Sequence, residues 1–176
     1  MTIEEPRQIN LKLGDLTIRG LVWGEGKPVL ALHGWLDNAA TFSRLAPLLK
    51  HCQVVAVDLP GHGLSDHRSK DARYIFLDWV CDVFAIADAL GWEQFSLMGH
   101  SMGAAIASLA AGTIPERILR LVLLEGLGPL CETPQDAPFT LRTFIEEQKR
   151  SPRFKDTTYT KRETIVERVN AKLSDL

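Results

Sequence analysis

Four short, mostly apolar runs are the feature that most restricts what this chain can fold into. They occupy residues 29–32, 54–57, 95–98 and 119–124; the first two are entirely apolar, whereas the third contains Ser96 and the fourth contains Arg120. A run of this length without polar alternation is typical of a strand that is buried on both faces, as in a parallel sheet. Parallel strands require crossover connections, which are usually helical. The pattern therefore predicts an α/β fold with a mostly parallel sheet and helices on both faces.

The segments around these runs predict the remaining elements of the core. Apolar residues alternate with polar ones on either side of Gly14–Asp15, which predicts a β-hairpin over residues 8–23. We expect helices over residues 38–50, 74–90 and 101–111. In the second helix, the spacing predicts that the buried stripe contains Leu77, Val80, Phe84 and Ala87, with Val83 and Leu90 beside it.

The composition changes near residue 126. Three prolines lie within residues 126–138 and predict a loop. A helix with Leu141, Phe144 and Ile145 on one face should follow, and a second helix should begin at the capping-box pattern Thr160-x-x-Glu163. We therefore expect residues 1–125 to form part of an α/β core and residues 126–176 to form a separate helical element.

Charge and composition exclude several classes of partner. The 20 basic and 22 acidic residues give a net charge of −2, and this balance argues against a nucleic-acid partner. No signal core and no apolar run long enough for a membrane span are present, so a cytoplasmic protein is expected. Three scattered cysteines and the absence of a dinucleotide fingerprint predict neither a metal site nor a cofactor. The oligomeric state is left open.

The pattern Gly99-His100-Ser101-Met102-Gly103 is the strongest chemical signal. This G-x-S-x-G sequence follows a predicted strand and opens a predicted helix, as a nucleophile elbow requires. Gly99 and Gly103 would give the sharp turn its space, and the helix N-terminus would add free N–H groups near the serine oxygen. The alternative is an ordinary βα turn with a helix-capping serine.

Two further motifs follow the first two apolar runs. Gly34 permits a bend that would aim the Trp35 amide into the site, where it could form an oxyanion hole with the Met102 amide. Such donors contribute roughly 3–4 kcal/mol each where charge develops. We expect His33 to be a structural hydrogen-bonding residue. The stretch Asp58-Leu59-Pro60-Gly61-His62-Gly63-Leu64-Ser65 is expected to be a structural turn beneath the site, with Asp58, Gly61 and Gly63 shaping it.

Taken together and in this order, the three motifs resemble the α/β-hydrolase fold superfamily. The stretch His33-Gly34-Trp35-Leu36-Asp37-Asn38 is especially similar to the serine hydrolase-like proteins within it, and the resemblance covers residues 10–130 well. It implies that Ser101 is the nucleophile, that Trp35 and Met102 supply the oxyanion-hole amides, and that the side chains of Trp35 and His100 line the substrate cavity. Residues 126–176 would begin a helical cap.

The sequence departs from the family pattern in its histidines. The family's triad runs Ser, then Asp or Glu, then His along the chain, and no histidine follows Ser101. Glu125 ends the fourth apolar run, where some haloalkane dehalogenases of the superfamily place their acid. The alternative for Glu125 is a residue that caps the strand or lines the pocket. We therefore expect the N-terminal part of a hydrolase core, truncated after the sixth strand and part of the cap.

Three functions are compatible with these motifs. The first is a serine hydrolase that, in its complete form, cleaves a small-molecule carboxylic ester or amide through an acyl-enzyme, with the present chain inactive alone. The second is a truncated, non-catalytic homologue that acts as a binding or interaction protein. The third is another chemistry on the same scaffold, such as acyl transfer or dehalogenation. A serine at the elbow, in place of aspartate, argues against dehalogenation.

Overall fold

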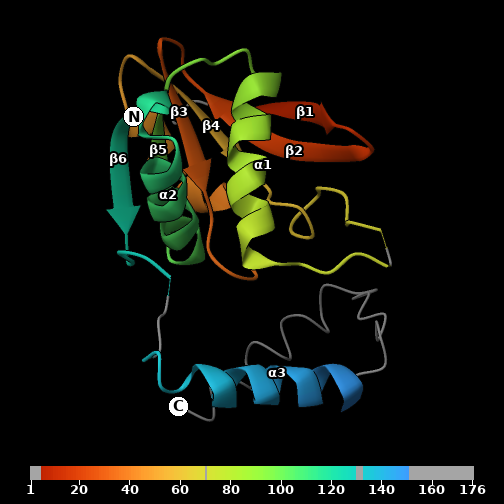
Figure 1. Cartoon of the computed structure of the whole chain (residues 1–176). Coiled ribbons are helices and arrows are strands. Elements are labelled where there is room, and N and C mark those ends of the chain that lie inside the picture. The colour runs from red at the N-terminus through yellow and green to blue at the C-terminus, as the bar shows by residue number, and fades with distance from the viewer. Residues whose placement is uncertain (1–4, 70, 130–132, 151–176) are drawn as a thin grey trace, which may run out of the picture. The chain divides into compact units, whose positions relative to one another are not determined.

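The computed structural model describes residues 5–69, 71–129 and 133–150 (Figure 1). The chain divides into two compact units, Met1–Leu130 and Cys131–Leu176, and each is described by itself. The first unit contains a six-stranded sheet and two α-helices, and the second contains α3 (Ala137–Arg150).

The sheet of the first unit is mostly parallel, as the sequence predicts. Its strands are β1 (Arg7–Leu13), β2 (Leu16–Trp23), β3 (Lys27–Leu32), β4 (Cys52–Val57), β5 (Phe95–His100) and β6 (Ile118–Leu124). They lie in the order β1-β2-β4-β3-β5-β6. The pairs β4–β3, β3–β5 and β5–β6 are parallel, whereas β1–β2 and β2–β4 are antiparallel. The predicted hairpin is confirmed, with Leu13 opposite Leu16 across the Gly14–Asp15 turn.

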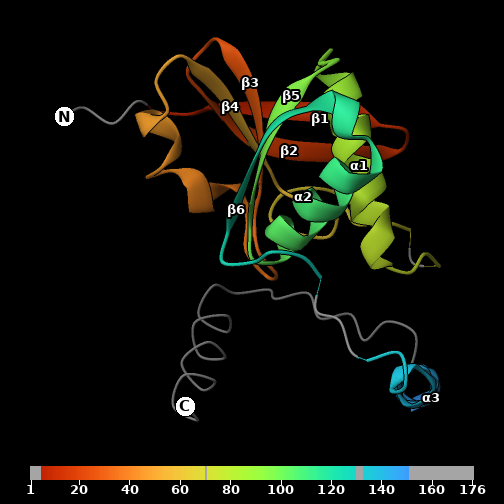
Figure 2. The same cartoon turned by 60° about the vertical axis from the view of Figure 1, so that its left-hand side comes forward.

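Helices cover both faces of this sheet, and Figure 2 shows the two layers. On one face lie α1 (Phe76–Ala89) and α2 (Met102–Thr113). On the other lie two 3₁₀ helices, η1 (Ala39–Phe42) and η2 (Ala46–Leu48); a third, η3 (Pro115–Arg117), precedes β6. In β3, Leu30 and Leu32 pack into the core on the α1 side, whereas Val29 and Ala31 pack on the other. Because both faces of β3, β4 and β5 are covered, the apolar runs in these strands show no regular polar alternation, whereas the expectation that the fourth run (residues 119–124) is buried on both faces is wrong.

The prediction of a single helix over residues 38–50 is wrong. The segment forms η1 and η2 instead, separated by a turn. Pro47 lies inside the segment, where it has no N–H for an α-helical hydrogen bond and its ring would clash with the preceding turn. It is accommodated near the start of η2, where an N–H would have no helical partner.

The prediction of the buried stripe of α1 is wrong in part. Leu77, which we expect inside from the spacing, is exposed, whereas Trp79, Val83 and Ile86 are fully or almost fully buried. An apolar-rich helix offers more than one stripe at a spacing of three or four residues, and the stripe with the large indole ring packs against the sheet. Asp82 is also buried, and it forms an ion pair of 2.5 Å with Arg68.

The outer strand β6 carries apolar side chains into solvent. It lies at one end of the strand order in the described sheet, and Leu119, Leu121 and Val122 are exposed.

In the second unit, α3 contains the predicted face with Leu141, Phe144 and Ile145. The helix expected to follow Thr160 lies outside the described residues. No helix in the described ranges is long and apolar enough to cross a membrane.

Helix α2 approaches the sheet so closely that one of its residues must lack a side chain. A Cβ on Gly103 would overlap the carbonyl oxygen of Leu32 in β3. A Cβ on Gly112, in the last turn of the same helix, would meet no atom within 4 Å. The two glycines therefore provide a matched pair in one helix.

We expect Gly103→Ala to lower the free energy of unfolding by about 1–3 kcal/mol, because the added methyl group overlaps backbone atoms that cannot move aside. Gly112→Ala should raise it by about 0.5–1 kcal/mol, because alanine loses less backbone entropy than glycine in a helix. Urea unfolding followed by far-ultraviolet circular dichroism measures both values. Equal effects of the two substitutions would contradict the close approach.

Candidate active site

Ser101 occupies a strained turn between β5 and α2. Its backbone angles are φ 51° and ψ −113°, a region that residues with a side chain rarely adopt. The turn is held on both sides: the Ser101 N–H donates to the Leu124 carbonyl (2.9 Å), and the Ser101 carbonyl accepts from the amides of Ala104 (2.9 Å) and Ala105 (3.2 Å). The Ser101 side chain is exposed at the carboxyl edge of the sheet. Strain of this kind persists only where the surroundings fix it.

The glycines of the motif provide the space for this turn. A Cβ on Gly99 would overlap the carbonyl group of Gly103, two residues beyond the serine. Met102 is the first residue of α2, so its amide has no partner within the helix. The amide of Met102 and the hydroxyl of Ser101 thus lie together at the positive end of the helix dipole.

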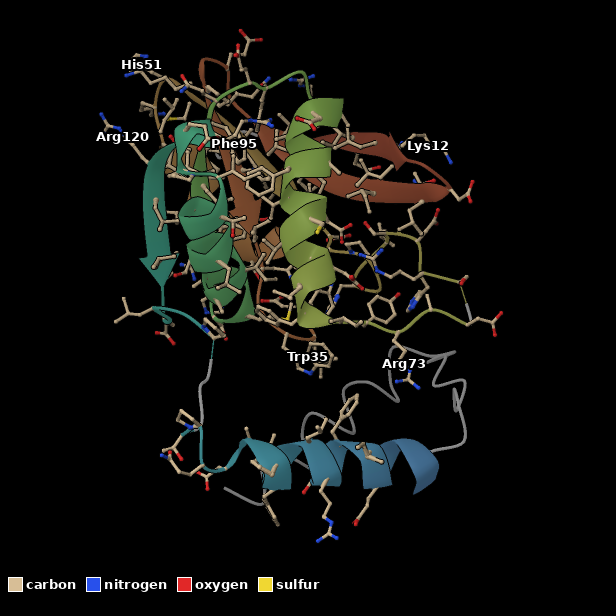
Figure 3. The ribbon with its side chains drawn as sticks, viewed as in Figure 1. Lys12, Trp35, His51, Arg73, Phe95 and Arg120 are labelled. Carbon is tan, nitrogen blue, oxygen red and sulfur yellow. The ribbon has the colours of Figure 1, made fainter. Side chains whose placement is uncertain are left out.

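The loop after β3 lies against Ser101. A Cβ on Gly34 would lie 3.4 Å from the Ser101 Cβ and 3.3 Å from His100 Nδ1. The fold therefore brings residues 33–35 and 99–103 together, although more than 60 residues separate them in the sequence. Trp35 follows this contact directly, and its side chain lies at the carboxyl edge of the sheet (Figure 3). Among the described residues, no hydrogen-bond acceptor engages the Trp35 amide.

Both ring nitrogens of His33 are occupied by the backbone. The Leu59 N–H donates to Nε2 (3.0 Å), so the proton lies on Nδ1, which donates to the Gly34 carbonyl (2.7 Å). The side chain is fully buried, and burial lowers the pKa of His33 because a charged ring would be desolvated. His33 is therefore a neutral link between the loops after β3 and β4.

Asp58 ties the same loops together through its carboxylate. This buried group accepts from the amides of Ala39 (2.7 Å) and Leu64 (2.8 Å). The Ser65 hydroxyl donates to the Asp58 carbonyl (2.6 Å). Gly63 has φ +54°, and a Cβ there would overlap the carboxylate, so the turn requires glycine at this position.

His100 and Glu125 flank the serine without a polar partner of their own. His100 is half-buried, and its Nδ1 is buried with no hydrogen bond from any described residue. Glu125 is exposed, and its carboxylate forms no hydrogen bond or ion pair within the described ranges. The Glu125 backbone has φ 55°. The adjacent Gly126 lies against the backbone of Ser101, since a Cβ on Gly126 would be 3.2 Å from the Ser101 carbonyl oxygen. The backbone that carries Glu125 is therefore a neighbour of the elbow.

Two features near the site were not found by sequence reasoning. One is a group of aromatic rings from Trp35, His62, Tyr74 and Trp79, which contact one another in a chain. The other is a cavity of about 670 Å³ between β1, β2 and residues 38–40, which is not lined by Ser101, Trp35 or His100. For the aromatic group, Trp79 on α1 is a signal that the sequence contains, but nothing in the sequence links Tyr74 to Trp35. Within the described residues, no group of three His, Cys, Asp or Glu side chains could hold a metal ion.

Two curated relatives resemble this chain over much of its length. A "Serine hydrolase-like protein" from Danio rerio is 44% identical over 134 residues, which is 74% of this chain and 41% of that protein. A "Serine hydrolase-like protein" from Dictyostelium discoideum is 34% identical over 173 residues, 93% of this chain and 47% of that protein. The chain thus spans less than half the length of either relative.

A solved structure and a family model extend this comparison to the fold. The crystal structure of a hypothetical protein from Pseudomonas aeruginosa PAO1 has a TM-score of 0.82 and 44% identity, and the match covers 91% of this chain and 57% of that one. The family model described as "alpha/beta hydrolase fold" matches residues 27–169, which include β3 and all later described elements. The chain therefore belongs to the α/β-hydrolase fold family.

Proposed function

We propose that this chain carries the nucleophile and oxyanion-hole part of a serine hydrolase that cleaves a small-molecule carboxylic ester or amide. The single observation that carries the proposal is the strained, exposed backbone of Ser101 with the loop of residues 33–35 lying against it. The names of the Danio and Dictyostelium relatives support the same class of chemistry.

The reaction proceeds through a covalent intermediate. The Ser101 Oγ attacks the carbonyl carbon of the substrate while its proton passes to a base, and the carbonyl oxygen becomes an oxyanion. The amides of Trp35 and Met102 donate to this oxygen, a role that the position of Met102 at the start of α2 supports. The alcohol or amine leaves with a proton, and water then hydrolyses the acyl-serine to release the acid and restore Ser101.

The base is the part of the reaction that these residues do not provide. His33 cannot accept a proton at Nε2 without losing the Leu59 hydrogen bond, and no histidine follows Ser101 in the sequence. Because the relatives are more than twice as long as the segment they share with this chain, we assign the base to the whole protein rather than to these 176 residues. Glu125 is the candidate acid, by its place beside the elbow.

A non-catalytic binding protein is the second candidate. The observation that favours it is the same lack of a histidine after Ser101, since a hydroxyl without a base is a poor nucleophile. The strained turn at Ser101 argues against it, because a binding surface has no need of an unfavourable backbone conformation.

We expect a fluorophosphonate probe to label the 176-residue chain slowly and only at Ser101. The loss of a triad member costs about 10⁴–10⁶ in rate, so imidazole added to the buffer should accelerate labelling by supplying a base. Peptide mapping by mass spectrometry identifies the labelled residue. Ser101→Ala should abolish labelling with and without imidazole.

The matched control for this experiment is Ser108→Ala, which removes another hydroxyl from the same helix. Ser108 donates to the Leu127 carbonyl (3.1 Å) and lies away from the elbow turn, so its loss should leave labelling unchanged. Equal labelling of the unchanged chain and Ser101→Ala would refute the nucleophile and favour the binding protein.

The role of His33 as a neutral link predicts a pH dependence of stability. Its pKa is lowered in the folded chain, so the unfolded chain binds the proton more readily. The resulting stability is fully present above the unfolded pKa of about 6.5 and is lost as the pH falls toward the folded pKa. Urea unfolding at pH 7.5 and pH 5.5 should show this loss.

Substitution of His33 tests its share of this pH dependence, to which His62, whose pKa is also lowered by burial, contributes in the same direction. His33→Asn should be less stable at pH 7.5 and should lose less stability between the two pH values. His51→Asn is the control, because His51 is exposed and its left-handed backbone (φ 62°) suits asparagine. An unchanged pH slope in His33→Asn would show that His33 is not the neutral link.

A further inference from the structure

Four rings contact one another beside the candidate active site, and we call them the aromatic platform (Trp35, His62, Trp79 and Tyr74); Trp35 and Tyr74 are its exposed members, whereas Trp79 is buried. Trp35 lies edge-on to His62 and to Trp79, with centroids 5.4 Å and 6.3 Å apart. Tyr74 stacks on Trp79 at 5.9 Å. These distances and angles are those of favourable aromatic pairs. The platform joins the loops after β3 and β4 to the start of α1.

Hydrogen bonds to the backbone engage the polar atoms of two platform rings. Trp79 Nε1 donates to the Pro60 carbonyl (3.3 Å), and the Tyr74 hydroxyl accepts from the Arg68 amide (2.9 Å). Gly61 lies so close to the Tyr74 ring that a Cβ there would approach it to 2.7 Å. Trp79 and Tyr74 are therefore held in place before any ligand arrives, and Trp35 packs edge-on against the fixed Trp79 ring, which lowers the entropy cost of binding.

The exposed part of the platform is apolar and faces solvent. Trp35 is 60% exposed although its ring already contacts two others, so much of its surface is free. Leu36 and Ile75, which follow Trp35 and Tyr74 in the sequence, are also exposed, as is Leu64, two residues after His62. A group of neighbouring apolar side chains in solvent is typical of a binding site.

Charged side chains lie at the Tyr74 end of the platform, where the Arg68 guanidinium is 6.0 Å from the centre of the Tyr74 ring and Arg73, the preceding residue in the sequence, is exposed. Arg68 forms its ion pair with Asp82, and the Asp37 carboxylate accepts from the Thr41 hydroxyl and the Asn38 amide. Burial lowers the pKa of His62, so its ring is neutral at pH 7. At its Trp35 end, the platform thus offers an apolar ring rather than a charge.

Trp35 connects this surface to the reaction. Its amide is the proposed oxyanion donor, and its side chain is part of the platform. A group that contacts the indole ring is therefore close to the carbonyl whose oxygen receives the amide hydrogen bond. We propose that the aromatic platform is the subsite for an uncharged aromatic or similarly planar apolar substituent of the ester or amide substrate. This inference rests on the proposed function for its place beside the reacting carbonyl.

Binding of a non-hydrolysed probe pair tests the subsite. 1-Naphthylacetamide and acetamide share the amide group and differ in the ring, and ligand-observed NMR titration of the Ser101→Ala chain gives both dissociation constants. Naphthylacetamide should bind at least about tenfold more tightly. Trp35→Ala should weaken its binding by about five- to tenfold, whereas Trp35→Phe, which keeps a ring, should weaken it by about threefold or less.

Three controls make the result specific. Phe139→Ala removes an exposed aromatic ring from the second unit and should leave binding unchanged. A cationic probe, naphthylmethyl trimethylammonium, should bind no more tightly than the neutral amide. Far-ultraviolet circular dichroism should show that Trp35→Ala is folded, since the side chain is mostly exposed.

Each contrary result overturns the proposal. Binding that is unchanged by Trp35→Ala, equally weakened by Phe139→Ala, or stronger for the cationic probe would show that the platform is not a neutral aromatic subsite. Because the titration uses a chain without Ser101, it reports the subsite independently of the nucleophile. Absence of fluorophosphonate labelling with intact naphthylacetamide binding would reject the proposed function alone.

Discussion

The close approach of α2 to the sheet is the constraint on which the rest of the site depends. Gly103 lies against the Leu32 carbonyl, so the helix begins immediately beyond β5 and leaves no room for a relaxed loop. Ser101 therefore adopts a left-handed backbone (φ 51°). A strained turn of this kind typically costs about 1–3 kcal/mol, which the packing of two glycines and three backbone hydrogen bonds offsets. The exposed hydroxyl at the carboxyl edge is the consequence.

The same edge is stabilised by buried polar groups whose hydrogen bonds, among the described residues, go to the backbone. His33 and Asp58 accept or donate only to backbone groups, and through them the segments after β3 and β4 hold one another in position. An unpaired polar group in such a place would be costly, because the surrounding core is apolar. Because these groups are paired, the loop that contains Gly34 and Trp35 is held in place by its neighbours, although it has no regular secondary structure. The loop lies beside Ser101, and no described acceptor engages its Trp35 amide.

Local patterns are sufficient to predict most of the elements. Apolar runs locate the strands, alternation locates the hairpin, and glycine spacing locates the turn at Ser101. Two predictions fail for physical reasons: Pro47 divides a segment that otherwise has a helical apolar pattern, and α1 buries Trp79 rather than Leu77 because ring packing decides between two stripes. The Arg68–Asp82 pair and the aromatic platform depend on contacts between distant segments, which a single sequence does not encode in any periodic form.

Strand β6 links the elbow to the open side of the sheet. The Leu124 carbonyl at its end accepts the Ser101 N–H, while Leu119, Leu121 and Val122 remain exposed at the outer strand of the described sheet. Edge strands with free backbone groups and apolar side chains are prone to pair with a further segment. Such pairing would bury these side chains and restrict the movement of β6. Because the Leu124 carbonyl accepts the Ser101 N–H, the outer strand and the strained turn are directly connected.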